Sequence, residues 1–122
     1  MTSPRILVIV GTPLRESLVH ALADSYVAAA TEAGAEVRVV DLARDEIPGH
    51  PTDRNELRAP RSEQDRPLDP AVAAYVESLA WADHVAFVYP QWWGTYPAAL
   101  KSFIDRVFLT NSAYRYRATG KL

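Results

Sequence analysis

A run of five branched apolar residues at positions 6–10, ILVIV, constrains the fold of this chain more than any other feature. A continuous apolar run of this length is typical of a strand that is buried on both faces, as in a parallel sheet. The segment EVRVVDL at 36–42 reads as a second strand. A helical pattern lies between the two, so residues 6–42 predict a βαβ unit with a right-handed crossover.

The predicted helix begins after Ser17, a suitable N-cap residue, and ends before Gly34, which suits the C′ position. Its apolar residues recur at helical spacing. One face carries Leu18, Leu22, Tyr26 and Ala30, with Val19, Ala23 and Val27 beside it. Residues 43–68 show no period and contain four prolines among charges that nearly cancel. A loop of this length is usually functional or disordered, and we interpret it as a solvated excursion.

The Asp69-Pro70 pair predicts a second helix, with Asp69 as N-cap and Pro70 at the first helical position. Its apolar face consists of Val72, Tyr75, Val76 and Leu79, and it ends near Asp83. The segment HVAFVYP at 84–90 predicts a third buried strand, and Pro97 predicts the first position of a third helix. This order of elements indicates a three-layer α/β fold.

In such folds ligands bind beyond the carboxyl ends of the strands, where this chain places the loops GTPLRES (11–17) and PQWWGTYP (90–97). GTPLRES precedes a helix N-terminus, whose free N–H groups and dipole favour anions such as phosphate. Thr12 and Ser17 can add hydroxyl donors, and Arg15 adds a charge. An ordinary βα turn explains the loop equally well, since it is neither a GxGxxG fingerprint nor a Walker A loop.

The second loop holds two adjacent tryptophans, Trp92 and Trp93, between a proline and a glycine. Its backbone N–H groups can donate to the carbonyls and ring nitrogens of a flat heterocycle, and its aromatic rings can form apolar walls around it. The alternative is that the tryptophans pack in the core or at a dimer interface. For at least one of them this alternative is strong, because adjacent residues in a turn rarely point the same way.

Composition narrows the possible functions. The 122-residue chain has no cysteine, and its three histidines are scattered, so we expect no metal site and a reducing, cytoplasmic setting. The formal net charge of −2 is not the basic footprint of a nucleic-acid binder. The N-terminus lacks the apolar region of a signal peptide, and no apolar run approaches the roughly 18 residues of a membrane span.

The stretch AWADHVAFVYPQWWGTYPAALKSFIDRVF at 80–108 resembles the NAD(P)H:quinone oxidoreductase family, flavodoxin-fold flavoenzymes also called NAD(P)H dehydrogenase (quinone). The shared pattern is carried here by Pro90, Gln91, Trp92, Trp93, Pro97, Leu100, Lys101, Asp105, Arg106, Val107 and Phe108. The βαβ start and the 69–83 helix are also similar. The resemblance implies a flavodoxin-like three-layer sandwich with a parallel sheet in the order 2-1-3. The family's strands 4 and 5 are absent, so we expect residues 1–122 to be a single domain that forms the N-terminal part of a longer one.

The resemblance also implies binding residues, because the family holds the flavin ring with the loop after strand 3 and the flavin phosphate with the loop after strand 1. The implied cofactor-binding residues are Thr12, Arg15, Ser17, Leu18, Pro90, Gln91, Trp92, Trp93 and Gly94. Thr12 and Val19 depart from the family, where many members have histidine and asparagine. Tyr114 and Tyr116 resemble a segment that reaches the active site across a dimer interface, which implies a role in substrate binding.

The implied activity is hydride transfer from NAD(P)H, through non-covalent FAD or FMN, to a quinone or similar acceptor, in a homodimer. No catalytic acid or base is required, and Lys101 and Asp105, spaced i, i+4, are expected to form a surface ion pair. Two alternatives stay open. One is a flavodoxin-type electron carrier, although such proteins are usually more acidic. The other is an inactive ancillary or truncated subunit that binds a partner through the open edge of its third strand.

Overall fold

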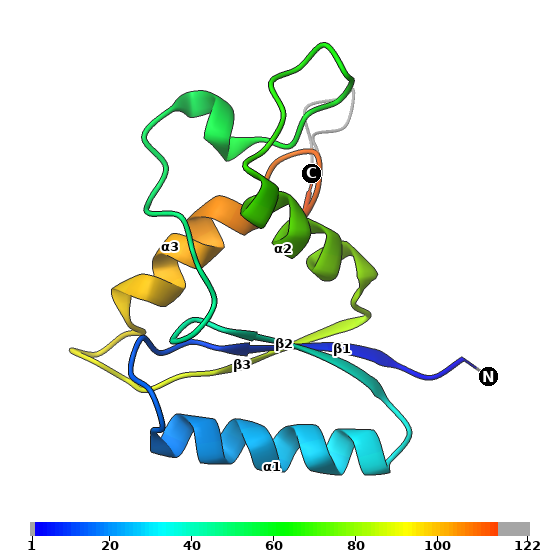
Figure 1. The fold of residues 1–122 in the computed structure, drawn as a ribbon, viewed down its shortest axis with the longest axis vertical. Helices are drawn as coiled ribbons and strands as arrows, with labels where there is room; N and C mark the ends of the chain where they lie inside the picture. Colours follow the sequence, from blue (N-terminus) through cyan, green and yellow to red (C-terminus); the bar gives the residue numbers. More distant parts are fainter. Residues whose placement is uncertain (1, 115–122) are drawn as a thin grey trace.

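The computed structural model describes residues 2–114 (Figure 1). Its elements are β1 (Arg5–Val10), α1 (Leu18–Glu32), β2 (Glu36–Asp41), the 3₁₀ helix η1 (Arg54–Leu57), α2 (Pro70–Trp81), β3 (His84–Val88) and α3 (Ala98–Val107). The strands form a parallel sheet in the order β2-β1-β3. Helix α1 covers one face of this sheet, and α2 and α3 cover the other (Figure 1). The predicted three-layer fold and strand order are confirmed.

The register brings the carboxyl ends of all three strands to one edge of the sheet. Val10, the last residue of β1, pairs with Asp41 of β2 and with Val88 of β3. The central strand β1 is buried on both faces, as predicted, because Leu7 and Ile9 face α2 and α3 whereas Val8 and Val10 face α1. The loops that follow β1 and β3 therefore leave the sheet side by side.

Only one of the two apolar rows of α1 packs against the sheet. Val19 and Ala23 are buried against Val8 and Val10, and Val27 packs beside them. The other row faces solvent, since Leu18 is 75% and Leu22 is 54% exposed. Helical spacing identifies both rows, whereas the orientation of the helix on the sheet decides which row is buried.

Two helix boundaries differ from prediction by one or two residues. Asp69 caps α2 as predicted, with Oδ1 accepting from the Ala71 N–H at 2.9 Å. However, α2 ends at Trp81, two residues before Asp83. Asp83 instead bonds to Arg5 at the start of β1: its N–H donates to the Arg5 carbonyl, and its carboxylate accepts from the Arg5 N–H. Pro97 is the N-cap residue of α3 rather than its first helical residue.

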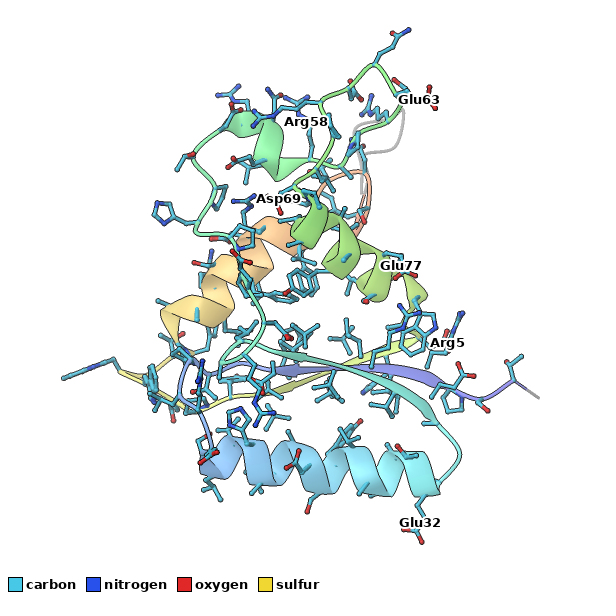
Figure 2. The ribbon with its side chains drawn as sticks, in the orientation of Figure 1. Arg5, Glu32, Arg58, Glu63, Asp69 and Glu77 are labelled. Carbon is cyan, nitrogen blue, oxygen red and sulfur yellow. The ribbon has the colours of Figure 1, made fainter. Side chains whose placement is uncertain are left out.

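The excursion, residues 43–68, is more ordered than its composition predicts. It contains η1, and Ala59 within it is buried, with its N–H donating to the Thr110 carbonyl at 2.9 Å. The buried Arg106 of α3 donates through Nη1 to the Gly49 carbonyl at 2.9 Å. Arg58 and Glu63 project from the excursion on the side of the sheet opposite to Glu32 of α1 (Figure 2). Most residues of the excursion are exposed, in agreement with the interpretation as a solvated excursion, and a few contacts anchor it on α3 and the segment after it.

Strand β3 lies at one edge of the sheet, and none of its five residues is fully buried. Phe87 remains 37% exposed even though its ring packs 6.2 Å from that of Phe108. The predicted apolar third strand is thus present, but it is less buried than the sequence pattern suggests.

Candidate functional site at the carboxyl edge of the sheet

The loops after β1 and β3 meet at Gly11. The Gly11 N–H donates to the Val88 carbonyl at 2.8 Å, which joins the two strand ends. A Cβ atom at Gly11 would lie 2.8 Å from Leu100 Cδ2 and 3.1 Å from Tyr89 Cβ. These distances are shorter than ordinary contacts between carbon atoms, so a side chain at this position would have to displace Leu100.

Loop 11–17 is built around Thr12. This side chain is buried, with 1% exposure, and its Oγ1 accepts from the Leu14 N–H at 3.2 Å. Thr12 therefore shapes the loop from inside, whereas the predicted binding residues Arg15 and Leu18 face solvent. Glu16 adopts a left-handed conformation, with φ of 51°, and directs the chain into α1.

The N-terminus of α1 leaves backbone donors open. Within residues 2–114, no group accepts from the N–H of Leu18 or Val19, and the first turn of α1 contains no acidic residue. Free N–H groups at the positive end of a helix attract an anion. Ser17, the N-cap residue predicted from the sequence, lies at the same point and is half-buried.

The loop after β3 forms a two-residue hairpin turn. The Trp92 N–H donates to the Thr95 carbonyl at 2.8 Å, and the Thr95 N–H donates back to Trp92 at 3.0 Å. Trp93 and Gly94, at the two central positions, have φ of 52° and 78°. Positive φ at both positions is the type I′ pattern, which glycine adopts readily and tryptophan adopts only at a cost.

The side chains of the two tryptophans in this turn differ in their exposure to solvent. Trp93 is completely exposed, at 103%, whereas Trp92 is half-buried. Tyr89 and Tyr96 brace the base of the loop, with ring centroids 6.1 Å apart and nearly perpendicular planes. In the part of the chain that the structure covers, the N–H groups of Gln91, Trp93 and Gly94 have no acceptor. Apolar walls and free donors thus occur together on this loop.

Further sequence predictions concern α3 and the segment after it. Tyr114 lies beyond α3, beside the excursion, where its hydroxyl oxygen accepts from Thr110 Oγ1 at 2.7 Å. Tyr116 lies outside the described residues. Lys101 and Asp105 form the predicted ion pair along α3.

Sequence reasoning missed a link between α1 and β2. The His20 ring lies between Ser17 and Asp41, 2.9 Å from Ser17 Oγ and 3.1 Å from each Asp41 carboxylate oxygen. The spacing of Ser17 and His20 at a helix start was the available local signal. The contact with Asp41 joins residues 21 positions apart and follows from packing α1 on β2.

Cavities lie beside the excursion. One, of about 220 Å³, is lined by Asn55, Arg58, Ala59, Pro60, Arg61, Asp65, Arg66 and Asn111. Beside it, the pKa of Glu56 is lowered, chiefly because its carboxylate accepts from the Thr52 N–H. Across residues 2–114 there is no helix suited to crossing a membrane and no cluster of three potential metal ligands.

The chain matches the Flavodoxin_2 family, of flavodoxin-like fold, over residues 4–122, and it belongs to that family. An uncharacterized NAD(P)H oxidoreductase of Escherichia coli (strain K12), YcaK, is 32% identical in an alignment of 119 residues that covers 93% of this chain and 57% of that protein. The solved structure of an NAD(P)H:quinone oxidoreductase from Methanothermobacter marburgensis is similar with a TM-score of 0.66 and 27% identity, covering 94% of this chain and 56% of the other.

An FMN-dependent NADH-azoreductase from Bacillus anthracis, solved in complex with FMN, has a TM-score of 0.66 at 15% identity, covering 96% of this chain and 61% of the other. At this identity the likeness shows the shared fold alone. The chain spans little more than half the length of these three proteins.

Proposed function

We propose that loops 11–17 and 90–97 hold the flavin of an NAD(P)H-dependent oxidoreductase. The observation that carries this proposal is the conformation and exposure of Trp93. Its backbone is left-handed, and its large apolar side chain lies entirely in solvent. Both features cost free energy in the free protein, and such costs cluster at ligand sites. A flat aromatic ligand against this loop would cover the exposed ring and accept from the free N–H groups beside it.

The residues present fit a flavin in two places. Trp92 and Trp93 would form the apolar walls around the ring, and the N–H groups of Gln91 and Gly94 would donate to its polar edge. Arg15, Ser17 and the free N–H groups of α1 would hold the phosphate, because the helix N-terminus is positive and lacks acidic residues. Thr12 would keep the loop in shape, and Leu18 would offer apolar surface beside the phosphate.

When bound, the flavin supplies hydride transfer between NAD(P)H and an acceptor such as a quinone. The protein's own contribution is to orient the ring and to keep donors directed at its polar atoms, so no side-chain acid or base is required. We further propose that the chain acts in a cytoplasmic homodimer. In it, Tyr114 and Tyr116 would contact the substrate of the partner subunit's site.

The test is an absorption spectrum of the 122-residue protein after incubation with FMN or FAD and desalting, followed by NADPH without oxygen. We expect retained flavin that bleaches on addition of NADPH. Retained flavin that stays oxidised would contradict the oxidoreductase activity and favour an electron carrier. Loss of all flavin on desalting would contradict the proposed site in this chain.

A further inference from the structure

The starting point is the polar chain that links Ser17, His20 and Asp41. Both side chains at its α1–β2 contact are largely buried, with 13% exposure for His20 and 15% for Asp41. His20 Nδ1 lies 2.9 Å from Ser17 Oγ and 3.3 Å from the Ser17 backbone nitrogen, and Nε2 lies 3.1 Å from both Asp41 oxygens. Every polar atom of the imidazole is therefore engaged.

These contacts decide where the imidazole carries its proton. A carboxylate only accepts hydrogen bonds, so Nε2 must donate to Asp41. In the neutral ring Nδ1 then has no hydrogen, and it accepts from the N–H and hydroxyl of Ser17. The two donors of Ser17 are thus turned inward to His20, although Ser17 stands at the anion-attracting end of α1.

Protonation of the ring reverses this arrangement. With a proton from solvent on Nδ1, the ring donates to Ser17 Oγ. The Ser17 hydroxyl hydrogen can then turn outward, whereas the backbone N–H keeps its direction and loses the ring nitrogen as its acceptor. One proton taken up by His20 therefore makes the hydroxyl donor available to an anion at loop 11–17. A bound anion would in turn favour the positive ring, because opposite charges at short range stabilise one another.

Several charged and titratable groups surround the imidazole. Asp41 faces Nε2, its Oδ1 also accepts from the Ala43 N–H at 2.9 Å, and Arg44 Nε lies 3.7 Å from its Oδ2. Asp45 accepts from the Asp41 N–H at 2.7 Å. His20 is the third residue of α1, Glu16 precedes this helix, and Asp24 lies four residues further along it. Arg5 of β1 and His84 of β3 are the titratable residues of these two strands. Both lie at the amino ends of their strands, whereas Asp41 lies at the carboxyl end of β2.

We propose that His20 and Asp41 are positioning residues that couple binding of the flavin phosphate to uptake of one proton by His20. This inference rests on the proposed flavin site. It gives the site a property that its geometry alone would not have, namely a phosphate affinity that rises as the pH falls through the titration range of histidine. Asp41 acts through His20, and neither residue touches the flavin ring.

The experiment measures the dissociation constants of FAD, FMN and riboflavin by flavin fluorescence between about pH 8.5 and about pH 6, where an imidazole titrates. The wild-type chain is compared with His20→Gln, which cannot titrate. For FAD and FMN we expect wild-type affinity to improve about tenfold relative to the variant on acidification. The titration of the FMN phosphate itself cancels in this ratio. Riboflavin has the same ring without phosphate, so it should show no difference between the two proteins.

A second measurement does not depend on the variant folding normally. In the wild-type protein, the NMR titration of the His20 ring should move to higher pH when FAD is saturating, and Asp41→Asn should abolish that shift. Equal pH dependence in wild type and His20→Gln, or a His20 titration that FAD does not move, would overturn the inference and leave the flavin site intact. Failure to bind flavin at any pH would overturn the proposed function and this inference with it.

Discussion

The excursion and the two loops at the carboxyl edge of the sheet are built in opposite ways. The excursion is long, charged and without sequence periodicity, yet its groups find partners: Ala59 pairs with Thr110, and Arg106 holds the Gly49 carbonyl. The carboxyl-edge loops are short and tightly turned. They nevertheless leave free N–H groups and a fully exposed Trp93. Length and polarity therefore do not indicate which of the two regions leaves groups without partners.

The two regions differ in which polar groups lack hydrogen-bond partners and which apolar side chains remain exposed. In the excursion, hydrogen bonds and ion pairs serve the fold itself, so their loss should reduce stability and spare ligand binding. In the carboxyl-edge loops, strained backbone and exposed apolar surface reduce the stability of the free protein. Such features persist where function requires them, and removing them should raise stability while weakening binding. Three substitutions test this contrast.

The largest expected effect is that of Arg106→Met. The change removes the bond to the Gly49 carbonyl and leaves that oxygen without its partner, which costs about 2 kcal/mol for a bond to a charged donor. Chemical denaturation should show this loss in the free energy of unfolding, while flavin affinity stays at the wild-type value. Arg61→Met, at an exposed position of the excursion, is the control and should change stability by no more than about 0.5 kcal/mol. A fall in flavin affinity with Arg106→Met would remove the distinction between the two regions.

Gly11→Ala should have the next largest effect, because it acts where the two loops meet. The added methyl group would lie 2.8 Å from Leu100 Cδ2, and the crowding should cost about 1–2 kcal/mol in the free energy of unfolding. Flavin affinity should fall as well, since the loops must move apart. Gly49→Ala provides the control, because its methyl group would meet nothing within 4 Å. Equal thermal stability of the two variants would show that the contact at Gly11 yields easily.

The smallest effect, and the most diagnostic, is expected for Trp93→Asn. Asparagine tolerates the left-handed backbone, so the free protein should become more stable by about 1 kcal/mol. Flavin affinity should nevertheless fall about two- to tenfold, because an aromatic contact is lost. Trp92→Ala is the matched comparison. Trp92 is half-buried, so this variant should lose both stability and flavin affinity. Unchanged flavin affinity in Trp93→Asn would contradict a binding role for that ring.

Much of the fold could be predicted because its signals are local. The buried strands are continuous apolar runs, and Ser17 and Asp69 mark helix starts through their own side-chain chemistry. The meeting of the two loops followed from the same pattern, since parallel strands joined by helices place their loops at one edge, where we propose the site. The boundary errors at Asp83 and Pro97 arose where a contact distant in sequence, or the conformation of the cap itself, set the helix end.

The sequence by itself determined the order of the elements, the parallel sheet, the two carboxyl-edge loops and the family pattern in the second loop, because these depend on residues close together in the chain. Tertiary structure decided which apolar row of α1 is buried and that the excursion docks on α3. It also decided that His20 reaches Asp41 and that Trp93 stands in solvent. Each of these depends on how separate elements pack, and helical or strand periodicity carries no information about that packing.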